Sequence, residues 1–308
     1  MVRPFRFAAY AYQAASRREW EETARRAEAL GYATLVMPDH FLNPLTPVPA
    51  LAAAAAVTTT LRVGSIVFAN DYRHPALLAK EAATLDLLSD GRFELGIGAG
   101  WHQTEYEQTG IPFDAAGIRV DRMEEGLQII RALWGDGPVT FQGAHYTIAG
   151  LEGTPKPVQK PHPPIFIGGT GKRMLRLAGR EADVVGFNPK PLPRGGHDWA
   201  GSTLDAREEQ LGWVREGAGE RFEHLELSTV AYRAIVTDRP QEIAAAIAPE
   251  YGVTAEQLLV LPDFAIGSVE GIVEQLLAQR ERLGVSYIEV GIAEAGAFAP
   301  VVARLAGR

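Results

Sequence analysis

Two stretches near opposite ends of the chain follow the same order of elements, and this repetition restricts the fold more than any other feature. "EALGYATLVMPD" ends an amphipathic helix at Gly31 and runs directly into the apolar strand Thr34 to Met37. "ERLGVSYIEVGI" repeats that order around Gly284. Glycine ends helices because it adopts the left-handed backbone conformation at little cost. The sequence therefore predicts a chain built from helix–strand units.

Similar units occupy the rest of the chain. Apolar runs typical of strands lie at residues 5–10, 34–37, 62–68, 93–98, 164–167, 184–187, 227–236 and 286–292. Helical patterns between them lie at residues 47–59, 75–88, 119–134, 172–180, 202–217 and 240–249. Strands that alternate with helices pair in parallel, and eight such units suit a closed (β/α)8 TIM barrel. A doubly wound open sheet is the alternative fold.

Two long segments interrupt the alternation. Residues 135–163 are rich in glycine and proline and contain "VTFQGAHYTI", which predicts a hairpin inserted over the mouth of the barrel. Residues 188–202 form a second long loop on the same side. Long loops at one rim are typical of lids over a site. We therefore expect a single domain, residues 1–308, that carries both insertions.

Composition excludes several classes of function. No stretch approaches the roughly 20 apolar residues that span a bilayer, and no basic run accompanies the net charge of −8, so neither a membrane nor a nucleic acid is an expected partner. The absence of cysteine excludes disulfides and thiolate sites and fits a cytoplasmic protein. The seven histidines show no helical metal spacing, which argues against a metal-dependent hydrolase, and no metal site is predicted.

Polar residues follow several of the predicted strands, where the active face of such a barrel lies. Asp39 and His40 follow the second strand, Asn70 follows the third and Asn188 follows the sixth. Taken singly, Asp39 could cap a turn and His40 could lie on a surface loop. Only their shared position at the strand ends favours a site.

Two glycine-rich stretches also follow strands. "GIGAG", from Gly96, lacks the last glycine of a dinucleotide fingerprint. "GGTGK", from Gly168, is not a Walker loop, because Phe166 and Arg173 occupy positions where that motif needs glycine and serine or threonine. Two glycines before a helix still expose backbone N–H groups that suit a phosphate. The glycines could equally serve only to turn the chain.

Four motifs taken together resemble the bacterial luciferase-like family of flavin and deazaflavin oxidoreductases. They are "MPDHF", "VGSIVFANDYRHP", "GRFELGIGAGWHQTEY" and "KPVQKPHPPIFIGGTG", in this order on successive strands. The resemblance covers nearly the whole chain. It is greatest to the branch that uses coenzyme F420, a deazaflavin, although FMN-using relatives share the same motifs.

This resemblance implies a role for each matching residue. Asp39 and His40 match a pair beside the cofactor ring, and His40 is the expected catalytic residue. Ser65 and Ile66 match a non-proline cis peptide that supports one face of the ring. The remaining cofactor-binding residues are Asn70, the loop Gly98, Ala99, Gly100 and Trp101, and the phosphate loop Gly168, Gly169 and Thr170. The substrate side is expected to comprise Tyr12, Trp101, His102 and Asn188.

The implied reaction is hydride transfer between F420 and a small organic substrate such as an alcohol, a carbonyl compound or an enone. His40 would move the accompanying proton, with its tautomer fixed by Asp39 or by the polar edge of the ring. Relatives that oxidise a sugar phosphate have a glutamate where this chain has Trp101, which argues against that substrate. An FMN-dependent monooxygenase and a non-catalytic cofactor carrier are the alternatives, and the family habit suggests a homodimer.

Overall fold

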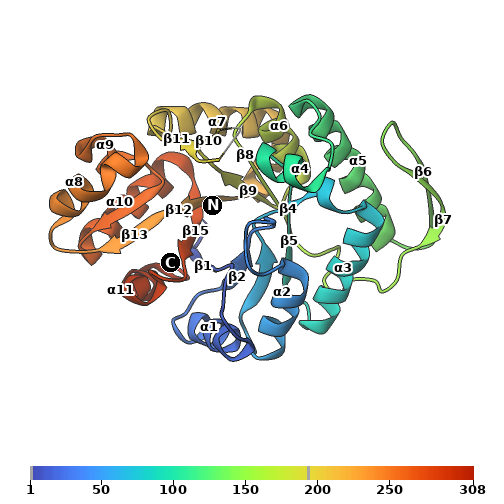
Figure 1. The fold of residues 1–308 in the computed structure, drawn as a ribbon, viewed down its shortest axis with the longest axis horizontal. Coiled ribbons are helices and arrows are strands. Elements are labelled where there is room, and N and C mark those ends of the chain that lie inside the picture. The colour runs from blue at the N-terminus through green and yellow to red at the C-terminus, as the bar shows by residue number, and fades with distance from the viewer. Residues whose placement is uncertain (1–2, 193–194) are drawn as a thin grey trace.

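The computed structural model describes residues 3–192 and 195–308 and confirms the closed parallel barrel (Figure 1). β3 pairs with both β2 and β5, which closes the sheet. A short strand, β4 (Phe68–Ala69), continues beyond β3 and also pairs with β5. The eight barrel strands are β1 (Arg6–Tyr10), β2 (Thr34–Met37), β3 (Arg62–Ser65), β5 (Phe93–Gly98), β8 (Ile165–Gly169), β9 (Val184–Phe187), β12 (Glu226–Ala231) and β15 (Val285–Gly291).

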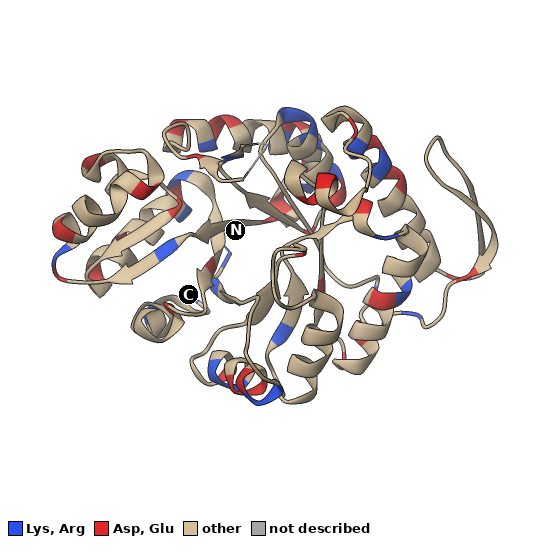
Figure 2. Cartoon of the chain, viewed as in Figure 1, with Lys and Arg blue, Asp and Glu red and all other residues tan. Residues whose placement is uncertain are grey.

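Helices surround the barrel and carry most of the charged residues on their outer faces (Figure 2). Helix α1 ends just before Gly31 (φ +82°) and α10 ends at Gly284 (φ +78°), which confirms the role predicted for both glycines. Within the described residues, no helix is long and apolar enough to cross a membrane. The helices are α1 (Arg17–Ala29), α2 (Pro47–Ala56), α3 (Pro75–Leu88), α4 (Gln103–Thr109), α5 (Ala116–Trp134), α6 (Lys172–Glu181), α7 (Leu204–Ala218), α8 (Pro240–Tyr251), α9 (Ala255–Val260), α10 (Val269–Leu283) and α11 (Ala295–Leu305).

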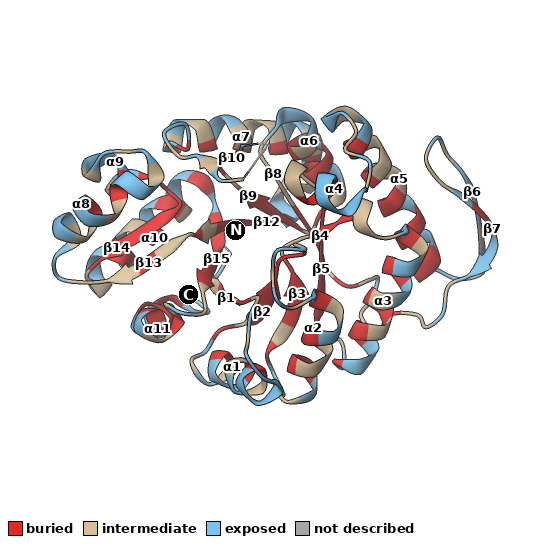
Figure 3. Ribbon diagram, in the orientation of Figure 1, coloured by how far each residue is buried: buried red, intermediate tan, exposed pale blue. Residues whose placement is uncertain are grey.

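The inside of the barrel is filled in layers of side chains. Apolar residues from five strands form its middle: Ala8, Val36, Phe166, Val184 and Tyr287. At the amino-terminal end of the strands, Arg6 bridges Glu94 at 2.6 Å and Glu226 at 2.7 Å. The barrel strands are accordingly buried along almost their whole length (Figure 3). These layers fill the interior from below, which leaves the carboxyl ends of the strands, where active sites of such barrels lie, as the candidate site.

The predicted strand at residues 227–236 is wrong in one respect, because it consists of two strands. β12 ends at Ala231, and β13 (Arg233–Val236) leaves the barrel to pair with β14 (Phe264–Gly267). The Tyr232 N–H donates to the Asp263 carbonyl at the point of divergence. The apolar run continues across this point, so the sequence pattern hides the change of partner.

The predicted hairpin consists of β6 (Pro138–Gln142) and β7 (Thr147–Glu152), but it lies along the outside of the barrel instead of over its mouth (Figure 1). Glu125 of α5 accepts hydrogen bonds from the N–H groups of Ala144, His145 and Tyr146 at the turn. The predicted loop 188–202 holds the short antiparallel pair β10 (Lys190–Pro191) and β11 (His197–Asp198), while residues 193 and 194 lie outside the described part of the chain.

Candidate active site

His40, at the end of β2, is held by a carboxylate that the sequence analysis did not select. Its Nδ1 lies 2.8 Å from Oε2 of Glu105 on α4. Glu105 also accepts hydrogen bonds from the Tyr72 hydroxyl at 3.0 Å and the Leu42 N–H at 3.1 Å. The Glu105 side chain is fully buried, whereas that of His40 is 27% exposed. Since Nδ1 donates to Glu105, Nε2 of His40 remains available as an acceptor.

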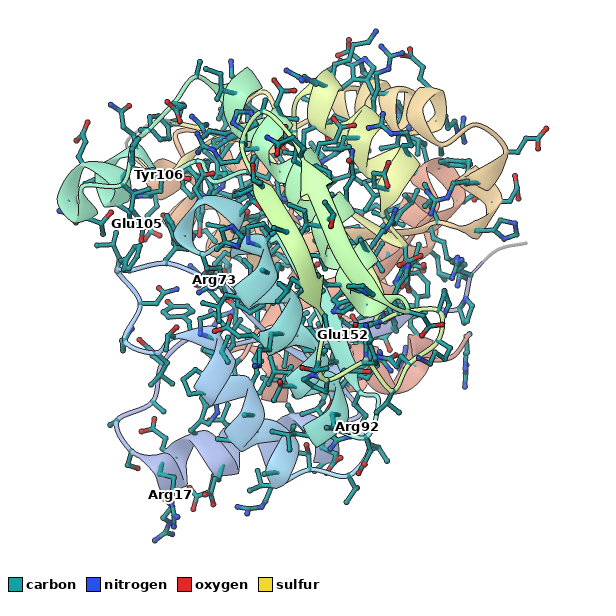
Figure 4. All side chains as sticks on the ribbon, turned by 90° about the vertical axis from the view of Figure 1, so that its right-hand side faces the viewer. Arg17, Arg73, Arg92, Glu105, Tyr106 and Glu152 are labelled. Carbon is teal, nitrogen blue, oxygen red and sulfur yellow. The ribbon has the colours of Figure 1, made fainter. Side chains whose placement is uncertain are left out.

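The surroundings of Glu105 keep it ionised. Burial opposes its charge, but the hydrogen bond and charge of His40, together with the Leu42 N–H and the Tyr72 hydroxyl, lower the pKa of Glu105 below its ordinary value. Burial, followed by the charge of Glu105, raises the pKa of Tyr72, so its hydroxyl stays a donor. In Figure 4, Glu105 is labelled beside Tyr106, toward the left edge of the view. Glu105 lies three positions after His102, within the motif that ends in "GWHQTEY". The spacing of residues in the sequence does not reveal that His40 is its partner.

Asp39 does not orient His40, contrary to one of the sequence-based alternatives. Its carboxylate accepts hydrogen bonds from Arg73 at 2.5 and 3.2 Å and from the Ala69 N–H at 3.1 Å. Asp39 is 8% exposed, and these donors come from the segment that follows β3. Asp39 therefore ties the ends of β2 and β4 together, beside His40.

The non-proline cis peptide lies one residue later than predicted, between Ile66 and Val67. Ser65 still belongs to β3: it pairs with Met37, and its hydroxyl bonds to the backbone of Gly96. The side chains of Ile66 and Val67 both pack against the apolar cluster inside the barrel. A Cβ atom at Gly98 would lie 2.7 Å from Val67, so glycine is needed there. Ile66 and Val67 form an apolar floor at the mouth.

The loop after β5 brings aromatic rings to the same mouth. Gly100 has φ +76°, and a Cβ atom there would lie 1.7 Å from the Tyr106 hydroxyl oxygen, so only glycine fits. The turn that it permits, through Ala99, places the Trp101 ring centroid 5.8 Å from His40, 5.0 Å from His102 and 5.7 Å from His197. Trp101 and His102 thus lie beside His40, as the sequence analysis expected.

The glycine loop after β8 precedes a helix whose first turn has no capping side chain. Gly168 and Gly169 end β8, Thr170 follows, and Gly171 takes the N-cap position of α6 without a side-chain bond. A Cβ atom at Gly168 would lie 3.2 Å from Nδ2 of Asn188. The loop and Asn188 are therefore neighbours at the mouth, and the N–H groups of α6 are open to an anion.

The opposite rim carries tyrosines. The rings of Tyr10 and Tyr12 are 5.5 Å apart after β1. The Tyr232 hydroxyl lies 3.4 Å from Oδ1 of Asn188 and 3.5 Å from Nε2 of His197, which are long distances for hydrogen bonds. Burial lowers the pKa of His197 to about 4, so its ring is neutral at pH 7. Tyr232 and His197 carried no motif that the sequence analysis used.

The side chain of Asn70, a predicted cofactor-binding residue, is bonded to the inserted hairpin. Its Nδ2 donates to the Tyr146 hydroxyl at 3.2 Å, and a Cβ atom at Gly126 would lie 2.6 Å from its Oδ1. The side chain therefore fills the space between α5 and the turn of the hairpin. Its observed contacts hold the hairpin, and they do not include the residues around His40.

Comparison with known proteins agrees with this geometry. The family model described as luciferase-like monooxygenase matches residues 1–262. An F420-dependent glucose-6-phosphate dehydrogenase of Microbacterium testaceum is 33% identical over 166 residues, 51% of this chain and 48% of that protein. An FMNH2-dependent dimethylsulfone monooxygenase of Pseudomonas putida is 27% identical over 196 residues, 64% of this chain and 50% of that protein. The chain thus spans about half the length of these curated relatives.

Solved structures share the fold over the whole chain. The coenzyme F420 dependent tetrahydromethanopterin reductase of Methanopyrus kandleri superposes with a TM-score of 0.77 at 19% identity, covering 98% of both chains. At that identity the likeness concerns the fold alone. Together with the family match over most of the chain, it agrees with the barrel and the order of its motifs. The chain therefore belongs to the luciferase-like monooxygenase family.

Proposed function

We propose that this protein is an F420-dependent oxidoreductase that transfers a hydride between the deazaflavin and a small alcohol, carbonyl compound or enone. The observation that carries the proposal is the pairing of His40 with the buried, ionised Glu105 at the mouth of the barrel. A histidine oriented in this way suits proton transfer near neutral pH. The F420-dependent relative from Microbacterium testaceum supports the choice of cofactor.

The residues at the mouth fit a flat tricyclic ring that carries a phosphate. Ile66 and Val67 offer an apolar surface for one face of the ring, and the absence of a side chain at Gly98 leaves room for Val67. The uncapped start of α6, after Thr170 and Gly171, offers N–H groups to the phosphate. When bound, the deazaflavin would supply a carbon that accepts or gives up a hydride. The chain itself must bind, orient and handle the proton.

His40 performs the proton transfer in this scheme. During oxidation of an alcohol, Nε2 of His40 accepts the hydroxyl proton, and the charge of Glu105 stabilises the imidazolium that results. During reduction of a carbonyl compound, the same nitrogen returns the proton. Trp101 and His102 flank His40 and limit the access of water. The aromatic surroundings favour an apolar or aromatic substrate of modest size.

The proposal is tested by titrating the purified protein with F420 and with FMN separately and following the change in cofactor fluorescence. We expect saturable binding of F420 and much weaker binding of FMN. Binding of FMN alone, with oxygen consumed after its reduction, would replace the proposal by an FMN-dependent monooxygenase. Binding of F420 without turnover across a panel of secondary alcohols, ketones and enones would favour a carrier.

A further inference from the structure

Glu289, a residue that the scheme above does not use, points into the barrel one layer beneath the mouth. It pairs in register with Ala8 of β1, while Gly291, two residues on, pairs with Tyr10 at the rim. Alternate residues of a strand face the same side, and Tyr287 of the same strand belongs to the interior cluster. Glu289 is therefore an interior side chain of the barrel, directly below the ring site proposed above.

The hydrogen bonds of Glu289 are incomplete. Its side chain is buried, with the residue only 1% exposed, and Oε1 lies 2.6 Å from the Ser228 hydroxyl. The Ser228 oxygen also lies 3.0 Å from the Tyr287 carbonyl. Oε2 is buried and has no hydrogen-bond partner within the described residues. A buried carboxylate without a cation is costly, whereas a protonated acid can donate to Ser228, whose hydroxyl then donates to Tyr287.

Among the described residues, the cation that acts on Glu289, Arg6, is already paired with other carboxylates. Arg6, on β1 and nearer the base of the barrel, is engaged by Glu94 of β5 and Glu226 of β12. The other titratable groups that face Glu289 are hydroxyls, those of Tyr10 on β1, Tyr232 after β12 and Tyr287 on its own strand. Burial raises the pKa of Glu289 to about 7. The hydrogen bond from Ser228 and the charge of Arg6 lower this pKa by smaller amounts, and the charge of Glu94 raises it further.

We propose that Glu289 is a positioning residue of the cofactor site: held as a neutral acid, it keeps the layer directly beneath the ring uncharged, and its ionisation weakens binding of the reduced ring. With F420 bound, a hydride delivered to the ring would bring one negative charge there, which persists until the ring takes up a proton. Successive inward layers of a strand are about 7 Å apart, so a carboxylate at residue 289 would repel that charge through a medium of low dielectric constant. The inference rests on the proposed function.

The first test needs no cofactor. The free energy of unfolding of the parent chain and of Glu289→Gln is measured by denaturant between pH 5 and pH 8. A raised folded-state pKa means that the native state binds the extra proton, so the parent should lose stability relative to Glu289→Gln as pH rises from about 4.5 to about 7. A difference that stays constant over this range would overturn the proposal. Ser228→Ala, which leaves the carboxyl in place, should retain the pH dependence.

The second test uses oxidised and reduced F420 with the same two proteins at pH 6 and pH 8. We expect equal affinities at pH 6 and, at pH 8, about tenfold weaker binding of reduced F420 by the parent than by Glu289→Gln. The affinities of the two proteins for oxidised F420 should differ less. If the ratio of the two proteins' affinities for reduced F420 is the same at pH 6 and at pH 8, the proposal is contradicted. If neither protein binds F420, the proposed function fails and FMN replaces it in the same test, while the unfolding measurement still decides the state of Glu289.

Discussion

The two sides of the barrel mouth differ in how completely their polar groups are bonded. On the side of β2 and β5, Asp39 and Glu105 each accept hydrogen bonds from three donor groups. On the side of β12 and β15, the Glu289 carboxyl has one hydrogen-bond partner, the Ser228 hydroxyl, and the Tyr232 hydroxyl has only long hydrogen-bond contacts, at 3.4 and 3.5 Å. The carboxylates of the first side are fully engaged without a ligand. On the second side, polar groups have unused hydrogen bonds that a ligand or a proton can satisfy.

Under the proposed function, this difference gives the two sides separate tasks. Fixed orientation is what a proton-transferring histidine requires, since a misplaced ring loses much of its rate advantage. Groups with unused hydrogen bonds are suited to recognition, because binding supplies the missing partner. We therefore place the chemistry at His40 and the discrimination between ligands near Tyr232.

The largest effect is expected on the bonded side, from His40→Ala. Removing the group that moves the proton should lower turnover by about 10²- to 10⁴-fold while F420 affinity changes little. Steady-state kinetics and fluorescence titration on the same preparation measure both quantities. His224→Ala, an exposed histidine, is the control. Lost affinity with unchanged turnover of the bound fraction would make His40 a cofactor ligand only.

A large loss of stability is expected from Arg73→Ala. Arg73 is the cation that balances the buried Asp39, and its removal leaves that carboxylate without a charged partner. Breaking a buried pair in this way typically costs about 3 to 5 kcal/mol. Denaturant unfolding measures the change, with Arg17→Ala as the exposed control. If Arg73→Ala loses no more unfolding free energy than Arg17→Ala, the Asp39 carboxylate is stable without Arg73 as its charged partner.

A charge placed at the start of α6 tests the phosphate loop. A side chain at Gly171 would have open space and ordinary backbone angles, and aspartate there should cap the helix, so the fold is retained. The same charge should repel the cofactor phosphate and weaken F420 binding about tenfold or more. Gly171→Asn caps the helix without charge and is the matched control. Equal affinities of the two variants would place the phosphate elsewhere.

The smallest effect is expected on the loosely bonded side, from Tyr232→Phe. Hydrogen bonds at 3.4 and 3.5 Å contribute little, so the free energy of unfolding should change by less than about 0.5 kcal/mol. A loss above about 1.5 kcal/mol would mean that the hydroxyl is as firmly bonded as Asp39. In that case the contrast between the two sides would disappear.

The sequence predicted the barrel because helix-ending glycines and apolar strands recur in a fixed order, as at Gly31 and Gly284. It also predicted that His40, Trp101 and His102 would meet, since residues after parallel strands share one rim. It did not predict β14, because four apolar residues carry little periodic signal. The partnership of His40 with Glu105 spans 65 residues and depends on how α4 packs, which no local pattern specifies.

The proposed mechanism requires His40 and Glu105 to act as one unit, and a double-mutant cycle on turnover measures this directly. His40→Ala, Glu105→Ala and the double variant are compared at saturating F420 and substrate. If Glu105 acts through His40, the double variant should be no slower than His40→Ala alone. If the two losses multiply, Glu105 acts independently of His40, and the paired arrangement at the mouth is not the catalytic unit.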